Sequence, residues 1–341
     1  MLSPPKESFL THSHYLLAFD YLLKGKISHN TECFYSDLKS RIITPGVLPG
    51  SNKFLRDEDQ IRRSMYNAWG TEFLIISSMH FISEDELIRI SNNWNCIQTY
   101  YVFYHCTQAL LVAKGQLRPD SHPKTQSAFC ALWAERPIIL PPWSLAFSHK
   151  GPINISDEVK IDLDIHPWAT FSKEQAWSIA IKSLKTTRLD YLADRIKDKR
   201  EEKRRQNRNE WKKKETIRIS NGRKQRKNPK FPLPQLTEEE KNKIFDSLRP
   251  YTLMDYLYRL RIKTNYEDSN MFTEGPQDKE SSRIVRGCFC RIASGTLFLH
   301  ELMLCSLLGP DKFKKWAEEW VKANVPQGME GGLRDRIKHY T

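Results

Sequence analysis

The chain has 341 residues, of which 39% are hydrophobic and 28% charged, and its formal net charge is +13. This apolar fraction is too high for a disordered chain, and 14 Gly with 18 Pro are too few for a collagen-like or proline-rich protein. The sequence contains no Walker loop, G-x-G-x-x-G, H-E-x-x-H, G-x-S-x-G or paired C-x-x-C motif, so the enzyme classes that depend on them lack support. We therefore expect no metal and no cofactor.

The cysteines and the apolar runs bear on location. Seven Cys without a C-x-x-C pair indicate free thiols in a reducing cytoplasm. The first ten residues, MLSPPKESFL, lack the basic and apolar regions of a secretory signal. Apolar runs stay below the roughly 18 residues that a membrane helix needs, so we expect no membrane partner.

The N-terminal part of the chain has the apolar spacing of helices. This spacing predicts helices over residues 8–23, 58–76 and 83–114, the last opened by a capping box at Ser83-Glu-Asp-Glu86. The stretch Thr99 to Ala113 is apolar on nearly every side, which is typical of the middle helix of a bundle. Gly115 then suits the C-terminal cap. We assign residues 1–145 to the N-terminal helices of a bundle.

Residues 146–236 have a different character and form a predicted mixed insertion. Strict alternation from Val159 to Ile165 predicts a strand or hairpin. Ser172-Lys-Glu-Gln175 has the form of a capping box ahead of an amphipathic helix, whose apolar face stops at Ile196. The helix is then expected to run on into solvent until Asn221-Gly222 ends it, and a basic linker should follow.

The positive charge of the protein is concentrated in this insertion. Residues 195–230 contain 17 Lys and Arg against five Asp and Glu, whereas the remaining residues contain 37 against 36. Concentrated charge creates a local field that attracts a polyanion, so we expect salt-sensitive binding to the backbone of RNA or DNA. A solvated charged helix is the alternative. Trp211 would stack on a base or anchor the helix against the body. The candidate nucleic-acid-binding residues are Lys203, Arg204, Arg205, Arg208, Trp211, Lys212, Lys213, Lys214, Arg223, Lys224, Arg226 and Lys227.

Residues 237–341 are predicted to complete the bundle. Thr237-Glu-Glu-Glu240 is another capping box, and apolar spacing predicts helices over 253–263, 278–308 and 312–323. The predicted fold class is therefore mainly α, a helical bundle carrying a mixed α/β, highly basic insertion.

Two segments together resemble the HEPN superfamily. The first is Tyr100-Tyr-Val-Phe-Tyr-His105 with the following Ala109-Leu-Leu111, and the second is Tyr258-Arg-Leu-Arg-Ile-Lys-Thr-Asn-Tyr-Glu-Asp268. The second segment, with Leu297 to Leu307, is also similar to the YaaC-like proteins. The resemblance implies a bundle of long helices, often a homodimer, and frequently a subunit of a prokaryotic antiviral defence or toxin–antitoxin complex. Many HEPN proteins are metal-independent ribonucleases that use an Arg and a His four to six residues apart.

The sequence departs from the HEPN family at this catalytic pair. Arg261 is followed after four residues by Tyr266 instead of His, and a tyrosine with its ordinary pKa near 10 is a poor base at neutral pH. The spacing does occur between Arg334 and His339, beyond the expected helix. His105 is interpreted as a core histidine and His122 as a loop residue.

Three functions remain open from the sequence. The leading one is a catalytically degenerate, nucleic-acid-associated HEPN-like protein in a defence complex. The second is a metal-independent ribonuclease that uses Arg334 and His339, or a site around Arg259, Arg261 and Tyr266. The third is a scaffold whose basic helix docks on an acidic protein partner.

Overall fold

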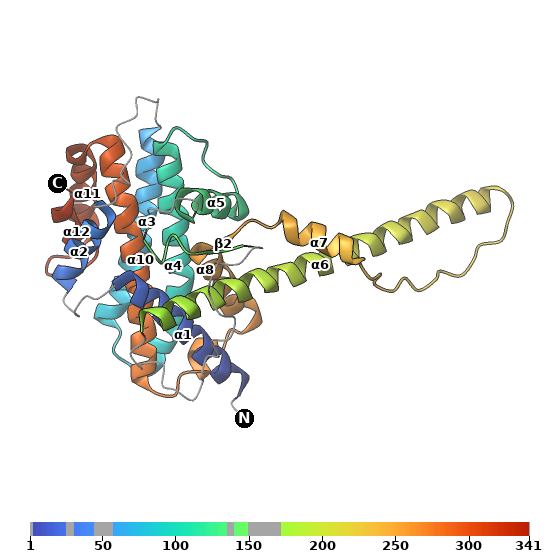
Figure 1. Ribbon diagram of the computed structural model, residues 1–341, viewed down its shortest axis with the longest axis horizontal. Coiled ribbons are helices and arrows are strands. Elements are labelled where there is room, and N and C mark those ends of the chain that lie inside the picture. The colour runs from blue at the N-terminus through green and yellow to red at the C-terminus, as the bar shows by residue number, and fades with distance from the viewer. Residues whose placement is uncertain (1–2, 25–30, 44–56, 135–139, 149–171, 341) are drawn as a thin grey trace.

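A computed structural model shows a helical body from which one long arm projects (Figure 1). It describes residues 3–24, 31–43, 57–134, 140–148 and 172–340. This part of the chain contains twelve α-helices and a single two-stranded sheet, so the protein is mainly α. The strand predicted between Val159 and Ile165 lies outside the described residues.

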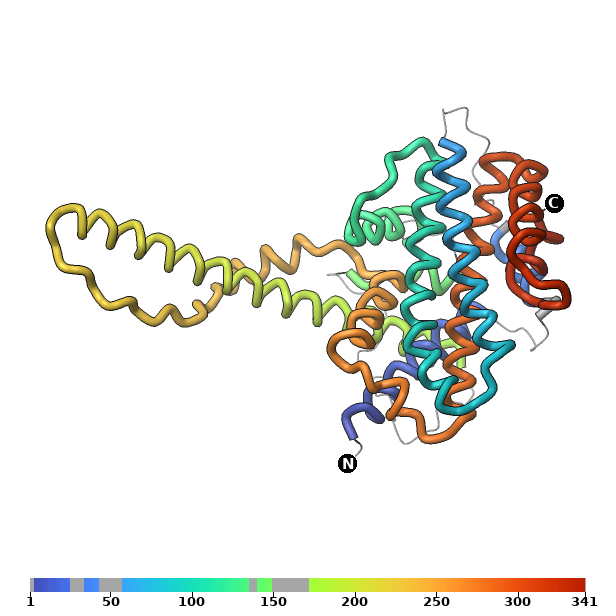
Figure 2. Tube along the Cα trace, turned by 180° about the vertical axis from the view of Figure 1, so that it is seen from behind, coloured from blue at the N-terminus to red at the C-terminus, as the bar shows by residue number. Residues whose placement is uncertain are grey.

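Three long helices form the centre of the body. Helix α4 (Asp85–Ala113) packs against both α3 (Glu58–Phe81) and α10 (Lys279–Leu308), and the three lie side by side in Figure 2. The prediction of a central helix is confirmed, because nearly every residue from Thr99 to Ala113 is buried or half-buried. Helix α10 is long and apolar enough to span a membrane. However, 89% of its apolar 18-residue stretch is buried inside the fold, as in the core helix of a globular protein.

Shorter helices cover this centre. Helix α1 packs against α10, α8 packs against α4, and α11 packs against α10. Short π-helical turns follow α5 and α8, and a 3₁₀ turn ends the described chain. The bounds are α1 Pro4–Lys24, α2 Thr31–Ile43, α5 His122–Phe129, α8 Leu253–Ile262, α9 Met271–Glu274, α11 Pro310–Asn324, α12 Leu333–Arg336, the π turns Cys130–Ala134 and Lys263–Glu267, and the 3₁₀ turn Ile337–His339.

A buried ionic cluster ties the C-terminus to the central helices. Arg336 in α12 is fully buried and donates through Nε to Glu301 Oε2 at 2.7 Å and through Nη2 to Glu72 Oε2 at 2.7 Å. Trp69 Nε1 donates to the other oxygen of Glu301 at 2.8 Å. These bonds satisfy groups that would be costly to bury alone, and they join α3, α10 and α12.

Two of the three predicted capping boxes form. The Ser172 hydroxyl accepts the backbone N–H of Gln175, and the Thr237 hydroxyl accepts that of Glu240. The prediction at Ser83 is wrong: the helix begins at Asp85, and the Ser83 hydroxyl donates to the carboxylate of Glu84 instead of capping the helix. Gly115 has φ of 74°, which is the left-handed conformation expected after a helix end.

The arm is built from one helix and a segment that returns along it. Helix α6 (Lys173–Ser220) has 48 residues and is about 72 Å long. Its first turns pack against α1 with Ala176, Ala180 and Leu184 fully buried, so they belong to the body, and the rest projects into solvent (Figure 1).

The chain turns back after Ser220. Gly222 follows the helix with φ of 75°, as the Asn-Gly pair predicted. Residues 223–236 contain no helix or strand, and α7 (Glu238–Ser247) leads back into the body. There β2 (Tyr251–Thr252) pairs antiparallel with β1 (Ala146–Phe147).

Candidate nucleic-acid interface

The base of the arm is fixed to the body and to α7. Arg188, only 1% exposed, donates to the carbonyl oxygens of Phe245 at 3.0 Å and Leu248 at 3.3 Å. Its guanidinium carbon lies 4.3 Å from the centroid of the Phe245 ring. Further out, Lys203 in α6 forms an ion pair with Glu240 in α7. These contacts set the direction in which the arm leaves the body.

Three contacts hold the return segment, residues 223–236, against α6. Arg200 Nε donates to the carbonyl oxygen of Pro234 at 2.9 Å. The Trp211 and Phe231 rings meet edge to face with centroids 6.3 Å apart. Trp211 thus anchors α6 to its own return segment, whereas the anchoring role predicted for it was against the body.

The third contact lies nearest the tip. Glu215 is only 3% exposed and accepts two hydrogen bonds from Arg226, one from its backbone N–H and one from Nε, both at 2.6 Å. The backbone hydrogen bond from Arg226 and its charged side chain hold the pKa of Glu215 below the ordinary value. The arm is therefore a closed hairpin.

The ion pairs of the arm's cations gather near its base, whereas the distal cations of the described chain are almost all unpaired. Lys199 and Arg204 pair with Glu202 and Glu201 at 2.8 and 3.5 Å, and Lys203 pairs with Glu240. Beyond Arg204, residues 205–230 contain eleven Lys and Arg but only two Glu. In the described part of the chain, only Arg226 of these eleven forms an ion pair. The positive field is therefore strongest toward the tip.

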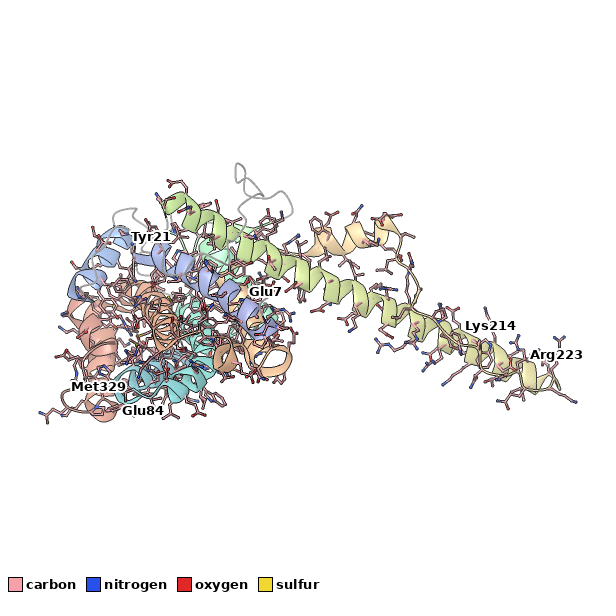
Figure 3. The ribbon with its side chains drawn as sticks, turned by 90° about the horizontal axis from the view of Figure 1, so that it is seen from below. Glu7, Tyr21, Glu84, Lys214, Arg223 and Met329 are labelled. Atoms are coloured by element: carbon pink, nitrogen blue, oxygen red, sulfur yellow. The ribbon has the colours of Figure 1, made fainter. Side chains whose placement is uncertain are left out.

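Figure 3 shows Lys214 and Arg223 at the far end of the arm, away from the body. Arg218 in α6 and Lys230 in the return segment also belong to the unpaired distal cations, although neither was among the predicted interface residues. The turn at Gly222 brings Lys230 back along α6. Of the predicted interface residues, Lys203, Arg204 and Arg226 are engaged within the arm. The exposed and unpaired ones are Arg205, Arg208, Lys212, Lys213, Lys214, Arg223, Lys224 and Lys227.

The spacing of Arg334 and His339 does not produce a catalytic pair. Arg334 donates through Nη1 to the Met329 carbonyl at 2.8 Å and through Nη2 to the Pro326 carbonyl at 3.2 Å, so it closes the turn ahead of α12. The His339 ring packs against Tyr35 and Phe298, with centroid distances of 6.2 and 6.0 Å. In the described chain no hydrogen bond joins the two side chains. Both residues therefore have structural contacts of their own.

Arg261 and Tyr266 are also not brought together. Arg261 lies among aromatic rings: its guanidinium carbon is 4.9 Å from the Tyr258 centroid and 5.3 Å from that of Tyr100, and Nη1 donates to the Tyr101 hydroxyl at 3.2 Å. Tyr266 lies on the π turn after α8 and is 78% exposed. No contact between Arg261 and Tyr266 occurs among the described residues. The π turn carries Tyr266 outward, away from the rings that hold the arginine.

The histidines near this ring cluster are placed by tertiary packing. His122 opens α5 instead of lying in a loop, and its Nδ1 lies 2.7 Å from the Tyr100 hydroxyl. Burial and then the charge of Arg261 lower the pKa of His122. His105 stacks on Tyr101, and burial lowers its pKa to about 4. Sequence spacing missed the approach of His122 to Arg261 because the two residues are 139 positions apart.

No protein-family model, curated protein or solved structure matches this chain. Within the described residues, no group of three His, Cys, Asp or Glu side chains is arranged to hold a metal ion. The arm is the feature of the molecule with the clearest binding chemistry.

Proposed function

We propose that the protein binds nucleic acid through the distal half of its arm. The observation that carries this proposal is that ten of the eleven cations between residues 205 and 230 have no carboxylate partner in the described structure. A field of this density attracts phosphates and releases their condensed counterions, so binding is electrostatic and sensitive to salt. Because the return segment is fixed along α6, these cations are presented on a preformed surface.

We further propose that the body is HEPN-like and catalytically degenerate, and that the protein is a subunit of a prokaryotic defence or toxin–antitoxin complex. The support is the sequence resemblance together with two placements. Tyr100 to His105 lies on the central helix α4, and Tyr258 to Asp268 lies on α8 and the turn after it. The separate contacts of Arg334 and His339, and the exposure of Tyr266 away from the rings that hold Arg261, support the loss of catalysis. The homodimer and the cytoplasmic location stay predictions.

The experiment measures binding of the full chain to fluorescent single-stranded RNA, single-stranded DNA, duplex DNA and an oligoglutamate peptide at low salt. We expect the nucleic acids to bind and oligoglutamate to compete weakly. A protein that binds none of the nucleic acids at low salt contradicts the proposal. Tight binding of oligoglutamate alone would favour the acidic-partner scaffold. The same RNA incubated without divalent ions is expected to stay intact, and cleavage would favour the ribonuclease.

A matched pair of variants locates the site. Changing Arg223, Lys224 and Lys227 to Gln removes unpaired cations near the tip, whereas changing Lys314, Lys315 and Lys322 in α11 to Gln removes the same charge from the body. We expect only the first variant to lose most of the affinity. Equal losses in both would mean that net charge and not the arm drives binding.

A further inference from the structure

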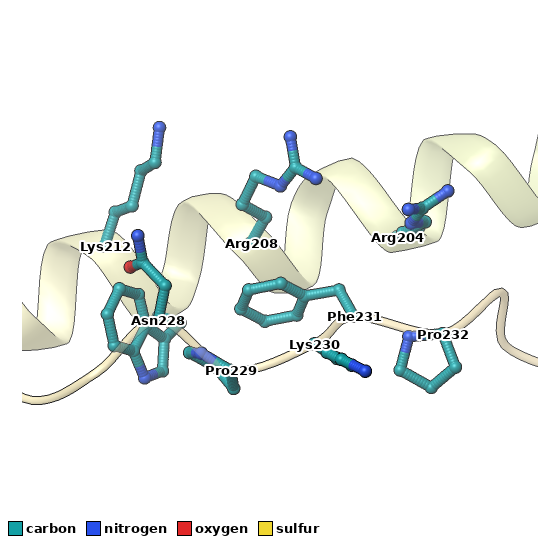
Figure 4. A pocket seen from close by; sticks show the side chains of 9 residues that line it. Arg204, Arg208, Lys212, Asn228, Pro229, Lys230, Phe231 and Pro232 are labelled. Atoms are coloured by element: carbon teal, nitrogen blue, oxygen red, sulfur yellow. The ribbon is translucent and has the colours of Figure 1, made fainter.

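A notch of about 610 Å³ opens between α6 and the return segment, part-way along the arm (Figure 4). Its floor is aromatic, formed by Trp211 from the helix and Phe231 from the return segment. Its rim is cationic, formed by Arg204, Arg208, Lys212 and Lys230. An aromatic floor inside a cationic rim matches the two parts of a nucleotide, a base with a π-face and a charged phosphate.

The rim cations are regularly placed and mostly free. Arg204, Arg208 and Lys212 are four residues apart, so they lie along one face of α6 at steps of about 6 Å. Arg208, Lys212 and Lys230 are exposed and form no ion pair in the described part of the chain. Only Arg204 is paired, with Glu201 at 3.5 Å. The rim thus offers several charges to consecutive phosphates of one strand.

The notch exists before any ligand binds. Trp211 and Phe231 are both half-buried, and their edge-to-face contact leaves part of each ring toward the opening. The two bonds between Glu215 and Arg226 close one end of the hairpin, and Pro229 and Pro232 restrict the backbone on either side of Phe231. Little conformational entropy therefore remains to be lost when a ligand enters.

We propose that this notch takes an unpaired nucleobase, so that the arm prefers single-stranded RNA or DNA over a duplex. The proposal rests on the proposed nucleic-acid binding and names its substrate class. The base stacks on the Trp211 and Phe231 rings while the flanking phosphates contact Arg208, Lys212 and Lys230. A duplex offers the arm only its phosphates, because its bases are already stacked and paired.

The test compares three probes of about 12 nucleotides, within the usual site sizes of single-strand binders, on the full chain at one salt concentration. They are a thymine strand, an abasic strand of equal length and charge, and a duplex. We expect the thymine strand to bind at least about tenfold more tightly than the abasic strand. Equal affinity for all three probes contradicts base binding in the notch but leaves the proposed backbone binding by the arm intact. Failure of every probe to bind overturns both.

Two substitutions separate stacking from support of the arm. Trp211→Leu removes the ring. It is expected to lower the affinity for the thymine strand about tenfold and to change the affinity for the abasic strand by less than about twofold. Trp211→Tyr keeps an aromatic face and should retain most of the affinity. If Trp211→Leu leaves the arm folded and lowers the affinity of both strands equally, the Trp211 ring does not stack on a base and the proposal is wrong. If Trp211→Leu unfolds the arm, the affinities of Phe231→Leu for the same two strands test the second ring instead.

Discussion

Glu215 and Arg226 join the two sides of the arm, because the nearly buried carboxylate of Glu215 accepts both the backbone N–H and the Nε–H of Arg226 at 2.6 Å. This pair lies just inside the turn at Gly222, where α6 ends and the return segment begins. Without it, the return segment would be held on α6 only by the contacts of Phe231 and Pro234, farther from the tip. With it, the unpaired cations stand on a closed hairpin of fixed shape.

Glu215→Gln is predicted to open the hairpin near its tip. The amide keeps an acceptor oxygen but loses the charge, and charge-assisted hydrogen bonds are about twice as strong as neutral ones. We expect the Arg226 amide and its neighbours to exchange hydrogen about fivefold faster. Hydrogen exchange followed by mass spectrometry measures this. The matched control is Glu210→Gln, which changes the same charge at an exposed position. Equal exchange rates in both variants would contradict the role given to Glu215.

Arg336→Met is predicted to destabilise the body strongly. The change leaves the carboxylates of Glu72 and Glu301 buried at 1% and 0% exposure without their cation. Breaking a buried pair from one side typically costs about 3–5 kcal/mol. Urea unfolding would measure this loss in the free energy of unfolding. The control is Arg334→Met, whose guanidinium binds only carbonyl oxygens near the surface and should cost far less. A smaller loss for Arg336→Met than for Arg334→Met would disprove the assignment.

Acid is predicted to weaken the body through His300. This residue is fully buried in α10, its Nδ1 lies 2.8 Å from the Thr296 carbonyl, and burial lowers its pKa to about 4. Between about pH 6.5 and pH 4 the unfolded chain binds a proton at this histidine that the folded protein does not. The free energy of unfolding should therefore fall as the pH falls through this window, by about 2–3 kcal/mol from His300.

Thermal unfolding across this pH window tests the prediction. His300→Gln removes one titrating group and should make the pH dependence shallower, although it lowers stability at every pH. The remaining dependence comes from His12 and His105, whose pKa values burial lowers to about 3 and about 4. His80→Gln, at an exposed position, should leave the pH dependence of the wild type unchanged. The same steep dependence in His300→Gln would show that other groups account for it.

Periodicity and local capping were enough to predict most of the helices. The apolar spacing placed α1, α3, α4, α10 and α11 close to their observed bounds, because burial follows the 3.6-residue repeat in the covering helices and the central ones are apolar over most of their length. The capping prediction failed at Ser83, where the acidic side chain of the next residue takes the hydroxyl hydrogen bond. A local sequence pattern does not decide between such competing partners.

Contacts between distant segments could not be predicted. Arg336 binds Glu72, which is 264 positions away in the sequence, and Glu301, which is 35 positions away. The approach of His122 to Arg261 depends on the packing of α4, α5 and α8. The basic segment itself was evident from the sequence. Its division into paired and unpaired cations was not, since that depends on the return of the chain along α6 and on the position of Glu240 in α7.

The most direct test of the account is the salt dependence of single-strand binding by the full chain and by two triple variants. The arm variant loses three unpaired cations, because Lys212, Lys213 and Lys214 are changed to Gln. The body variant loses three cations of α11, because Lys314, Lys315 and Lys322 are changed to Gln. The slope of log affinity against log salt should become shallower by about 2 in the arm variant, as expected for three lost phosphate contacts, and stay unchanged in the body variant. Equal slopes in the two variants would contradict binding through the arm.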